Sequence, residues 1–292
     1  MNIKRWYEWK EITEIRKKII EGVPIAINGL SDTQRHHFVY SLIEGAEKRA
    51  LYIAANDLQA RKAFRNLESL FGEGFFYFPF REKMLYDVES KSRDQSFQRI
   101  ECLGKMLEND YTVIVLSCES IIDYYMPPDE FKSYFISLKT GDTVNIEEFI
   151  RRLSVIGYER EERVEARGQF SIRGGIIDIF PVQYEKPVRI ELFDIEIDSM
   201  RIFDAESQRS YENVGQICIF PANEFVLTEE QVRKVTERLD TELTEYLNRI
   251  KDRDLTALFR SNFGMYSEKL KNSGSFAGID KFIPYFYDKG HS

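Results

Sequence analysis

The first third of the chain alternates short apolar runs with segments whose hydrophobic residues recur every three or four positions. The runs predict strands at residues 25–28, 50–54, 75–78 and 112–116. Ser31 or Asp32, Asp57, and a capping box at Ser92 and Gln95 predict the starts of the helices between them. The inward positions of these helices are Phe38, Leu42 and Ala46, then Ala60, Phe64, Leu67 and Phe71, then Phe97, Ile100, Leu103 and Leu107. Strands that alternate with helices of this length predict a parallel α/β sheet.

The pattern changes after Pro127 and Pro128, where strand-like segments become dominant. We expect strands at residues 135–138, 168–180, 188–193, 197–203 and 216–220, with one helix at 146–155. Short connections favour antiparallel pairing. After Pro221 a second capping box, Thr228 with Gln231, predicts a long amphipathic helix. Its predicted inner stripe is Val232, Val235, Leu239, Leu243, Tyr246 or Leu247, and Ile250.

Residues 167–194 contain an alternation that sends an aromatic residue to the polar face of a strand. If Val188, Ile190 and Leu192 face the core, then Arg189, Glu191 and Phe193 share the other face. The same reasoning turns Phe170 and Ile172 inward and Gln169, Ser171 and Arg173 outward. Two arginines and a phenylalanine on one open face have the composition of a protein-binding hot spot. The pattern alone slightly favours the alternative, in which the phenylalanine packs under a neighbouring loop or helix.

Composition and charge narrow the classes of function. The 292 residues carry a formal net charge of -8, so the chain as a whole disfavours non-specific binding to duplex DNA, although a local basic patch could override this. Three widely spaced cysteines fit neither a disulfide framework nor a zinc site. No signal core or membrane span is visible, which predicts a soluble cytoplasmic protein.

The segment after the first predicted strand occupies the place of a phosphate-binding loop. A working loop needs a second glycine, a lysine and a hydroxyl at positions where this chain has Gln34, Arg35 and His36, following Gly29. Weak nucleotide binding stays conceivable, but the favoured interpretation is an ordinary turn without hydrolysis. His36 and His37 diverge by about 100° on a helix, and scattered carboxylates mark no acid–base pair. We therefore expect no catalytic residues, no metal site and no cofactor.

With these residues on the page, the chain resembles the N-terminal part of the bacterial transcription-repair coupling factor (Mfd) family, itself similar to the excision-repair protein UvrB. The resemblance covers nearly the whole chain. Three stretches carry it: residues 157–210, which begin GYEREERVEARGQFSIRGG, FPFREKMLYDV at 78–88, and SGSFAGIDKFIPYF at 273–286. Unlike UvrB, the chain lacks the lysine-containing loop and leaves little room for a DNA-clamping hairpin between Tyr86 and Phe97.

The resemblance implies an α/β fold with three parts. These are a degenerate P-loop-NTPase-like parallel-sheet domain (1–126), an inserted β-rich α+β domain (127–213), and a helical return segment (214–292) that packs on the first domain. The aromatic residues at the end predict that further chain completes the return segment. The family's ATP-dependent translocase motor lies outside these residues, so we expect no ATPase here.

The resemblance also implies partners. The inserted domain would bind UvrA through Arg173, Arg189 and Phe193, with Arg167 as a weaker candidate because the turn at Gly168 leaves its direction open. This agrees with the alternation and reverses the preference for a packed phenylalanine. RNA polymerase and double-stranded DNA would bind to later domains, and a C-terminal domain could mask the UvrA-binding face. The alternative is an ATP-dependent DNA damage-processing enzyme like UvrB.

Overall fold

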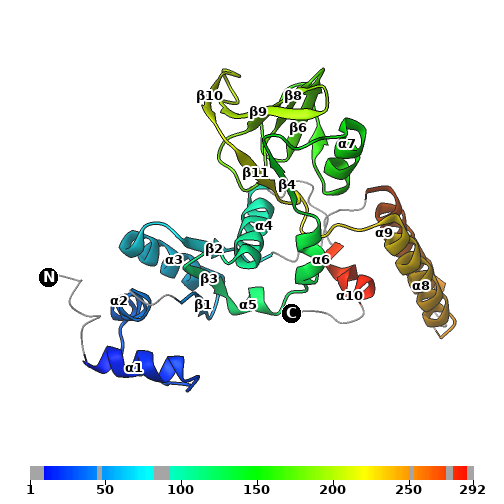
Figure 1. The fold of residues 1–292 in the computed structure, drawn as a ribbon. Helices are drawn as coiled ribbons and strands as arrows, with labels where there is room; N and C mark the ends of the chain where they lie inside the picture. Colours follow the sequence, from blue (N-terminus) through cyan, green and yellow to red (C-terminus); the bar gives the residue numbers. More distant parts are fainter. Residues whose placement is uncertain (1–9, 45–47, 82–92, 250–252, 274–278, 288–292) are drawn as a thin grey trace. The chain divides into compact units, whose positions relative to one another are not determined.

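The computed structural model describes residues 10–44, 48–81, 93–249, 253–273 and 279–287 (Figure 1). The described parts of 1–81 and 105–122 form one compact unit, and those of 82–104 and 123–292 form a second. Each unit mixes helices with strands, so the predicted α/β class is confirmed. No helix among the described residues is both long and apolar enough to cross a membrane.

The first unit is built on a parallel three-stranded sheet, as predicted. Its strands are β1 (Ala50–Ala54), β2 (Phe75–Phe78) and β3 (Val113–Ser117), in the order β1-β3-β2. The predicted strand at 25–28 is wrong, because these residues form no regular structure. Pro24 cannot donate a ladder hydrogen bond, and Gly29 turns the chain at a φ of 82°, so these two residues limit the segment to four positions. Among the described residues no strand pairs with it.

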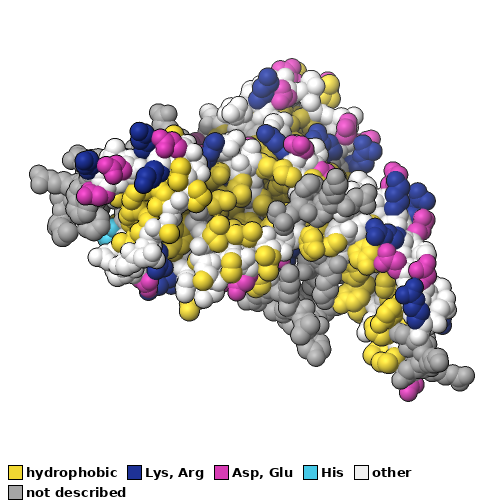
Figure 2. Space-filling model, turned by 90° about the horizontal axis from the view of Figure 1, so that it is seen from below, with side chains coloured by type: hydrophobic (Ala, Val, Ile, Leu, Met, Phe, Trp, Pro, Cys, Tyr) yellow, Lys and Arg dark blue, Asp and Glu magenta, His cyan; other side chains and the backbone are white. Residues whose placement is uncertain are grey.

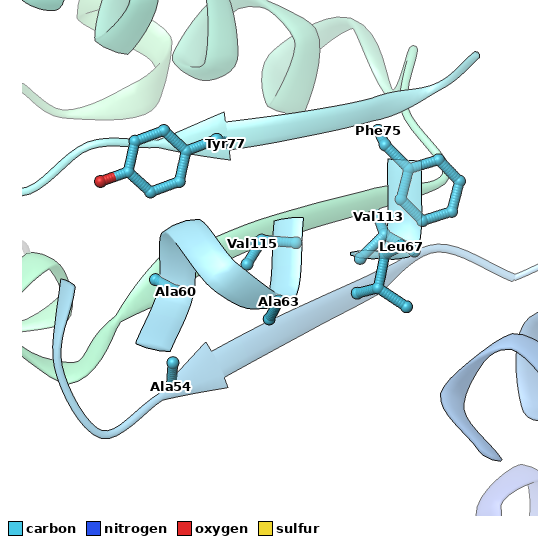
Figure 3. Packing of buried hydrophobic residues seen from close by; sticks show 8 residues of the cluster. All are labelled: Ala54, Ala60, Ala63, Leu67, Phe75, Tyr77, Val113 and Val115. Atoms are coloured by element: carbon cyan, nitrogen blue, oxygen red, sulfur yellow. The ribbon is translucent and has the colours of Figure 1, made fainter. Parts of the chain in front are cut away.

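Helices α1 (Lys10–Ile20), α2 (Asp32–Ile43), α3 (Asp57–Phe71) and α5 (Cys118–Ile121) complete the first unit. Ser31 caps α2 in a reciprocal box with Gln34. The cap of α3 is Asn56 rather than the predicted Asp57, because the Asn56 side chain accepts from the Gln59 amide. The eight-residue core of Figure 3 contains Leu67, Tyr77 and Val115 and lies between α3 and the sheet.

The other face of this sheet is less covered at β1, where Leu51 and Ile53 are exposed. Hydrophobic side chains gather on the side of the molecule that Figure 2 shows. Ile27 and Leu58 add to the exposed apolar surface of the first unit.

The second unit contains a six-stranded sheet in the order β10-β9-β8-β7-β6-β5. All neighbours pair antiparallel except β5 with β6, which is parallel. The predicted segment 168–180 is two strands, because Gly174 at a φ of 60° turns the chain into a hairpin. The strands are β5 (Glu159–Arg160), β6 (Gln169–Arg173), β7 (Ile176–Ile179), β8 (Val188–Phe193), β9 (Glu196–Phe203) and β10 (Ser210–Asn213).

A separate antiparallel pair joins β4 (Ile136–Lys139) to β11 (Gln216–Ile219). The predicted domain boundary between residues 213 and 214 therefore falls between the strands β10 and β11. Strand β11 lies after this boundary but pairs with β4, which lies near the start of the predicted inserted domain (127–213). The boundaries at 126 and 213 stay predictions.

The helices of the second unit follow the predicted caps where these are described. Thr228 and Gln231 form the predicted capping box of α8 (Glu229–Leu247), and Leu247 rather than Tyr246 is buried. Some predicted positions lie outside the described residues: the box at Ser92, the side chain of Phe71, Ala46 and Ile250. The helices wholly within this unit are α6 (Pro128–Ser133), α7 (Ile146–Val155), α8, α9 (Arg253–Ser273) and α10 (Ile283–Phe286), with a 3-10 turn, η2 (Ile279–Phe282). Helix α4 (Arg93–Glu108) begins in the second unit, and its residues from 105 onward are counted with the first.

Candidate protein-interaction site

Phe193 projects into solvent from the last position of β8. Val188 and Ile190 are fully buried, whereas Phe193 is 79% exposed, so the predicted alternation holds along this strand. Leu192, predicted to face the core, is half-buried next to a bulge in β9. Among the described residues no loop or helix covers the Phe193 ring, so the alternative of a packed phenylalanine is wrong.

The hairpin that carries Phe193 is braced along its other strand. Phe193 pairs with Glu196 across a turn in which Asp194 has a φ of 58°. The Val144 amide donates to the Ile195 carbonyl at 2.7 Å, and the Ile197 amide donates to the Asp142 carbonyl at 2.8 Å. An exposed aromatic residue on a hydrogen-bonded turn loses little conformational entropy when a partner covers it.

A buried carboxylate on β7 receives both predicted arginines. Arg189 binds Asp178 through two bonds, Nε to Oδ1 at 2.7 Å and Nη2 to Oδ2 at 2.9 Å. Arg173 donates through Nη2 to the same Oδ2 at 2.7 Å. The Asp178 side chain is 1% exposed, and β6, β7 and β8 bring the three groups together. Two guanidinium groups on one carboxylate leave one net positive charge on this face.

The two arginines differ in how much of the guanidinium group remains available. Arg189 also donates to the Gln208 carbonyl at 3.3 Å and lies 4.8 Å from the Phe203 ring centroid. Its side chain is 17% exposed, and its hydrogen bond to Asp178 raises its pKa. The Arg173 side chain is 53% exposed. Arg173 is therefore the better placed of the two to meet a partner.

The sequence predicted the other residues of this face only in part. Ser171, predicted to face outward, is buried, because the segment before β6 covers it and its hydroxyl donates to the Glu162 carbonyl at 2.9 Å. Ile176, which pairs with Arg173 across the hairpin, is exposed. Glu191 accepts from Arg201 at 2.6 Å. Sequence reasoning missed Asp178 and Ile176, although their place opposite Arg189 and Arg173 follows once the strand register is known.

Arg167 lies apart from the Arg173–Asp178–Arg189 cluster. It occupies the turn before β6 and is half-buried, and Gly168 follows it with a φ of 80°. Its role in partner binding stays a prediction.

The segment that resembles a phosphate loop is closed by its own side chains. The Ser31 hydroxyl accepts from the Gln34 amide at 3.4 Å, and the Gln34 side chain accepts from the Ser31 amide at 2.9 Å. Asp32 brings a negative charge to the helix start, 3.9 Å from Arg35. Burial lowers the pKa of His36, which favours its neutral form. These features oppose a phosphate at the start of α2.

The described residues contain no group of three or more His, Cys, Asp and Glu side chains that could hold a metal ion.

Comparison with known proteins identifies the part of the chain that contains this sheet. Residues 136–225 match the family described as the UvrB interaction domain. The chain is 31% identical over 279 residues to a transcription-repair-coupling factor of Bacillus subtilis, a match that covers 94% of this chain and 24% of the relative. A Staphylococcus aureus protein of the same name is 32% identical over 216 residues, covering 74% of this chain and 18% of the relative. The chain thus spans about a quarter or less of the relatives' length.

Proposed function

Because the chain is homologous to transcription-repair-coupling factors and carries a match to the UvrB interaction domain, we propose that it recruits UvrA to sites of transcription-coupled DNA repair. In this role it links stalled RNA polymerase to nucleotide excision repair. The first unit is then a nucleotide-binding-like domain of P-loop-NTPase type whose phosphate loop is degenerate. RNA polymerase and double-stranded DNA are bound by other domains of the full-length protein, and one of those domains masks the UvrA-binding face.

The observation that carries the proposal is that the same sheet presents the exposed Phe193 ring and the half-exposed guanidinium group of Arg173. An apolar ring on a braced hairpin fits a pocket on a partner, and Arg173 fits a carboxylate at the edge of that pocket. The match to the UvrB interaction domain spans every residue of this cluster. UvrA is the partner because the UvrB-like resemblance of this domain implies it.

Arg173→Gln is expected to weaken the binding of purified UvrA about tenfold. The substitution removes a charged hydrogen bond, and such bonds contribute about 1.5–3 kcal/mol in buried contacts, less at a partly exposed site. Biolayer interferometry with immobilised UvrA measures the dissociation constant. Arg35→Gln, which removes the same charge from the first unit, serves as the matched control and is expected to bind like the unmodified chain. Failure of the unmodified chain to bind UvrA at micromolar concentrations would refute the proposed function.

The competing function is that of an ATP-dependent DNA-processing enzyme like UvrB. A ligand that binds only the folded state raises the melting temperature by mass action. The capping box and Asp32 at the start of α2 predict no such rise with ATP and magnesium, whereas a ligand at about a hundred times its dissociation constant would stabilise the folded chain by about 2.7 kcal/mol. Differential scanning fluorimetry with intact UvrB as the positive control makes this measurement. A clear rise for this chain would favour the enzyme over the recruitment module.

A further inference from the structure

Asp178 is the one buried carboxylate that both predicted contact arginines share among the described residues. Resting on the proposed function, we propose that Asp178 is a positioning residue of the partner-binding face. It fixes Arg173 and Arg189 before the partner arrives, and Arg189 acts through Asp178 rather than by touching the partner.

The Asp178 carboxylate holds two guanidinium groups in the free chain. Its two oxygens take three hydrogen bonds, at 2.7, 2.7 and 2.9 Å, from two guanidinium groups on the neighbouring strands. A long arginine side chain loses much of its rotamer freedom when a partner fixes it. Asp178 fixes both arginines in the free chain, so that this cost is met before binding.

The two arginines differ in what their guanidinium groups bind. Arg189 uses three separate N–H donors on Asp178 and the Gln208 carbonyl, and it stacks on Phe203. The loop that contains Gln208 is itself held, because the Gln208 side chain donates to the Val164 carbonyl at 3.2 Å. Arg189 is thus a brace inside the domain. Arg173, with one hydrogen bond to Asp178 and half of its side chain in solvent, keeps donors for a partner's carboxylate.

Phe193 lies outside this network of hydrogen bonds. It lies four positions after Arg189 on β8, roughly 13 Å away at about 3.3 Å per residue. Sites more than about 7–10 Å apart without shared partners contribute additively to a measured change in free energy. Coupling between Asp178 and Arg173 without coupling between Asp178 and Phe193 is therefore the signature of positioning.

A double-mutant cycle on UvrA binding tests the assignment. Asp178→Asn keeps the shape of the side chain but removes its charge, and we expect it to weaken binding about tenfold. Adding Arg173→Gln to Asp178→Asn should cost at least about threefold less than the product of the two single losses, since contacting groups couple. Adding Phe193→Leu, which keeps an apolar group and measurable binding, should give the full product. Asp240→Asn on α8 controls for the loss of one negative charge.

The outcomes separate positioning from general destabilisation and from failure of the proposed function. Additive losses in both cycles, or unmodified binding by Asp178→Asn, would refute the role of Asp178 while leaving recruitment by Phe193 intact. No UvrA binding by the unmodified chain would refute the proposed function itself. If Asp178→Asn melts below the assay temperature, Asp178→Glu replaces it, since it keeps the charge but displaces it by one methylene. The same coupling pattern is then expected.

Discussion

Phe193→Ala is expected to weaken the binding of UvrA by about thirtyfold or more and to leave the melting temperature unchanged. Truncating a central hot-spot residue costs about 2 kcal/mol or more, which is about thirtyfold in affinity. The ring buries little in the free chain, because 79% of Phe193 is exposed. Its removal therefore takes contacts from the complex and almost none from the fold. Isothermal titration calorimetry and thermal melting of the same samples measure the two quantities.

The same sheet offers a matched control for this prediction. Tyr211 on β10 is a second exposed aromatic residue, with 59% of its surface in solvent. Tyr211→Ala removes a similar apolar area from a different strand and is expected to bind UvrA as the unmodified chain does. Equal affinities for Phe193→Ala and the unmodified chain would exclude Phe193 from the interface. Equal losses for both variants would point to a general change in the sheet instead.

The exposure of Phe193 could be predicted because it depends on local alternation alone. Within one strand the direction of each side chain follows from the period of two, and buried Val188 and Ile190 fix which face is the core. The link between Arg173 and Arg189 could not be predicted this way. It needs the registers of two strand pairs, which place Asp178 opposite Arg189 and next to the Arg173 hairpin. Register depends on turn geometry and core packing that single-strand patterns do not contain.

The helix starts show the same division between local and distant causes. The cap at Ser31 and the capping box at Thr228 could be predicted because each is a contact between residues three apart. The reciprocal bond from Gln34 that completes a box at Ser31 was not predicted. The segment 25–28 has apolar residues suited to a strand, but no strand among the described residues pairs with it. The pairing of β4 with β11 joins segments almost eighty positions apart and was likewise beyond local patterns.

A buried charge cluster that lies only partly within the family match contributes to the stability of the second unit. Arg99 on α4 is 1% exposed and donates to both oxygens of Glu224, at 3.0 and 3.1 Å. Asp123 lies 3.8 Å away and the Tyr125 hydroxyl 3.4 Å away. Burial alone would lower the pKa of Arg99, but the charges of Glu224 and Tyr125 and their hydrogen bonds to Arg99 together outweigh it, so the pKa is raised and the cation persists. Glu224 lies within the matched residues 136–225, whereas Arg99 precedes them.

Arg99→Met is expected to lower the free energy of unfolding of the second unit by about 3–5 kcal/mol, because it leaves buried carboxylates without their cation. For a unit of this size the melting temperature should fall by roughly 6–20 °C. Arg93→Met is the control, because its pair with Glu159 is exposed and should contribute at most about 1 kcal/mol. Adding Glu224→Gln to Arg99→Met removes one buried negative charge and should restore part of the loss. A fall of less than about 1 kcal/mol for Arg99→Met in urea unfolding would contradict this, since the second unit would then be stable without the bond between α4 and Glu224.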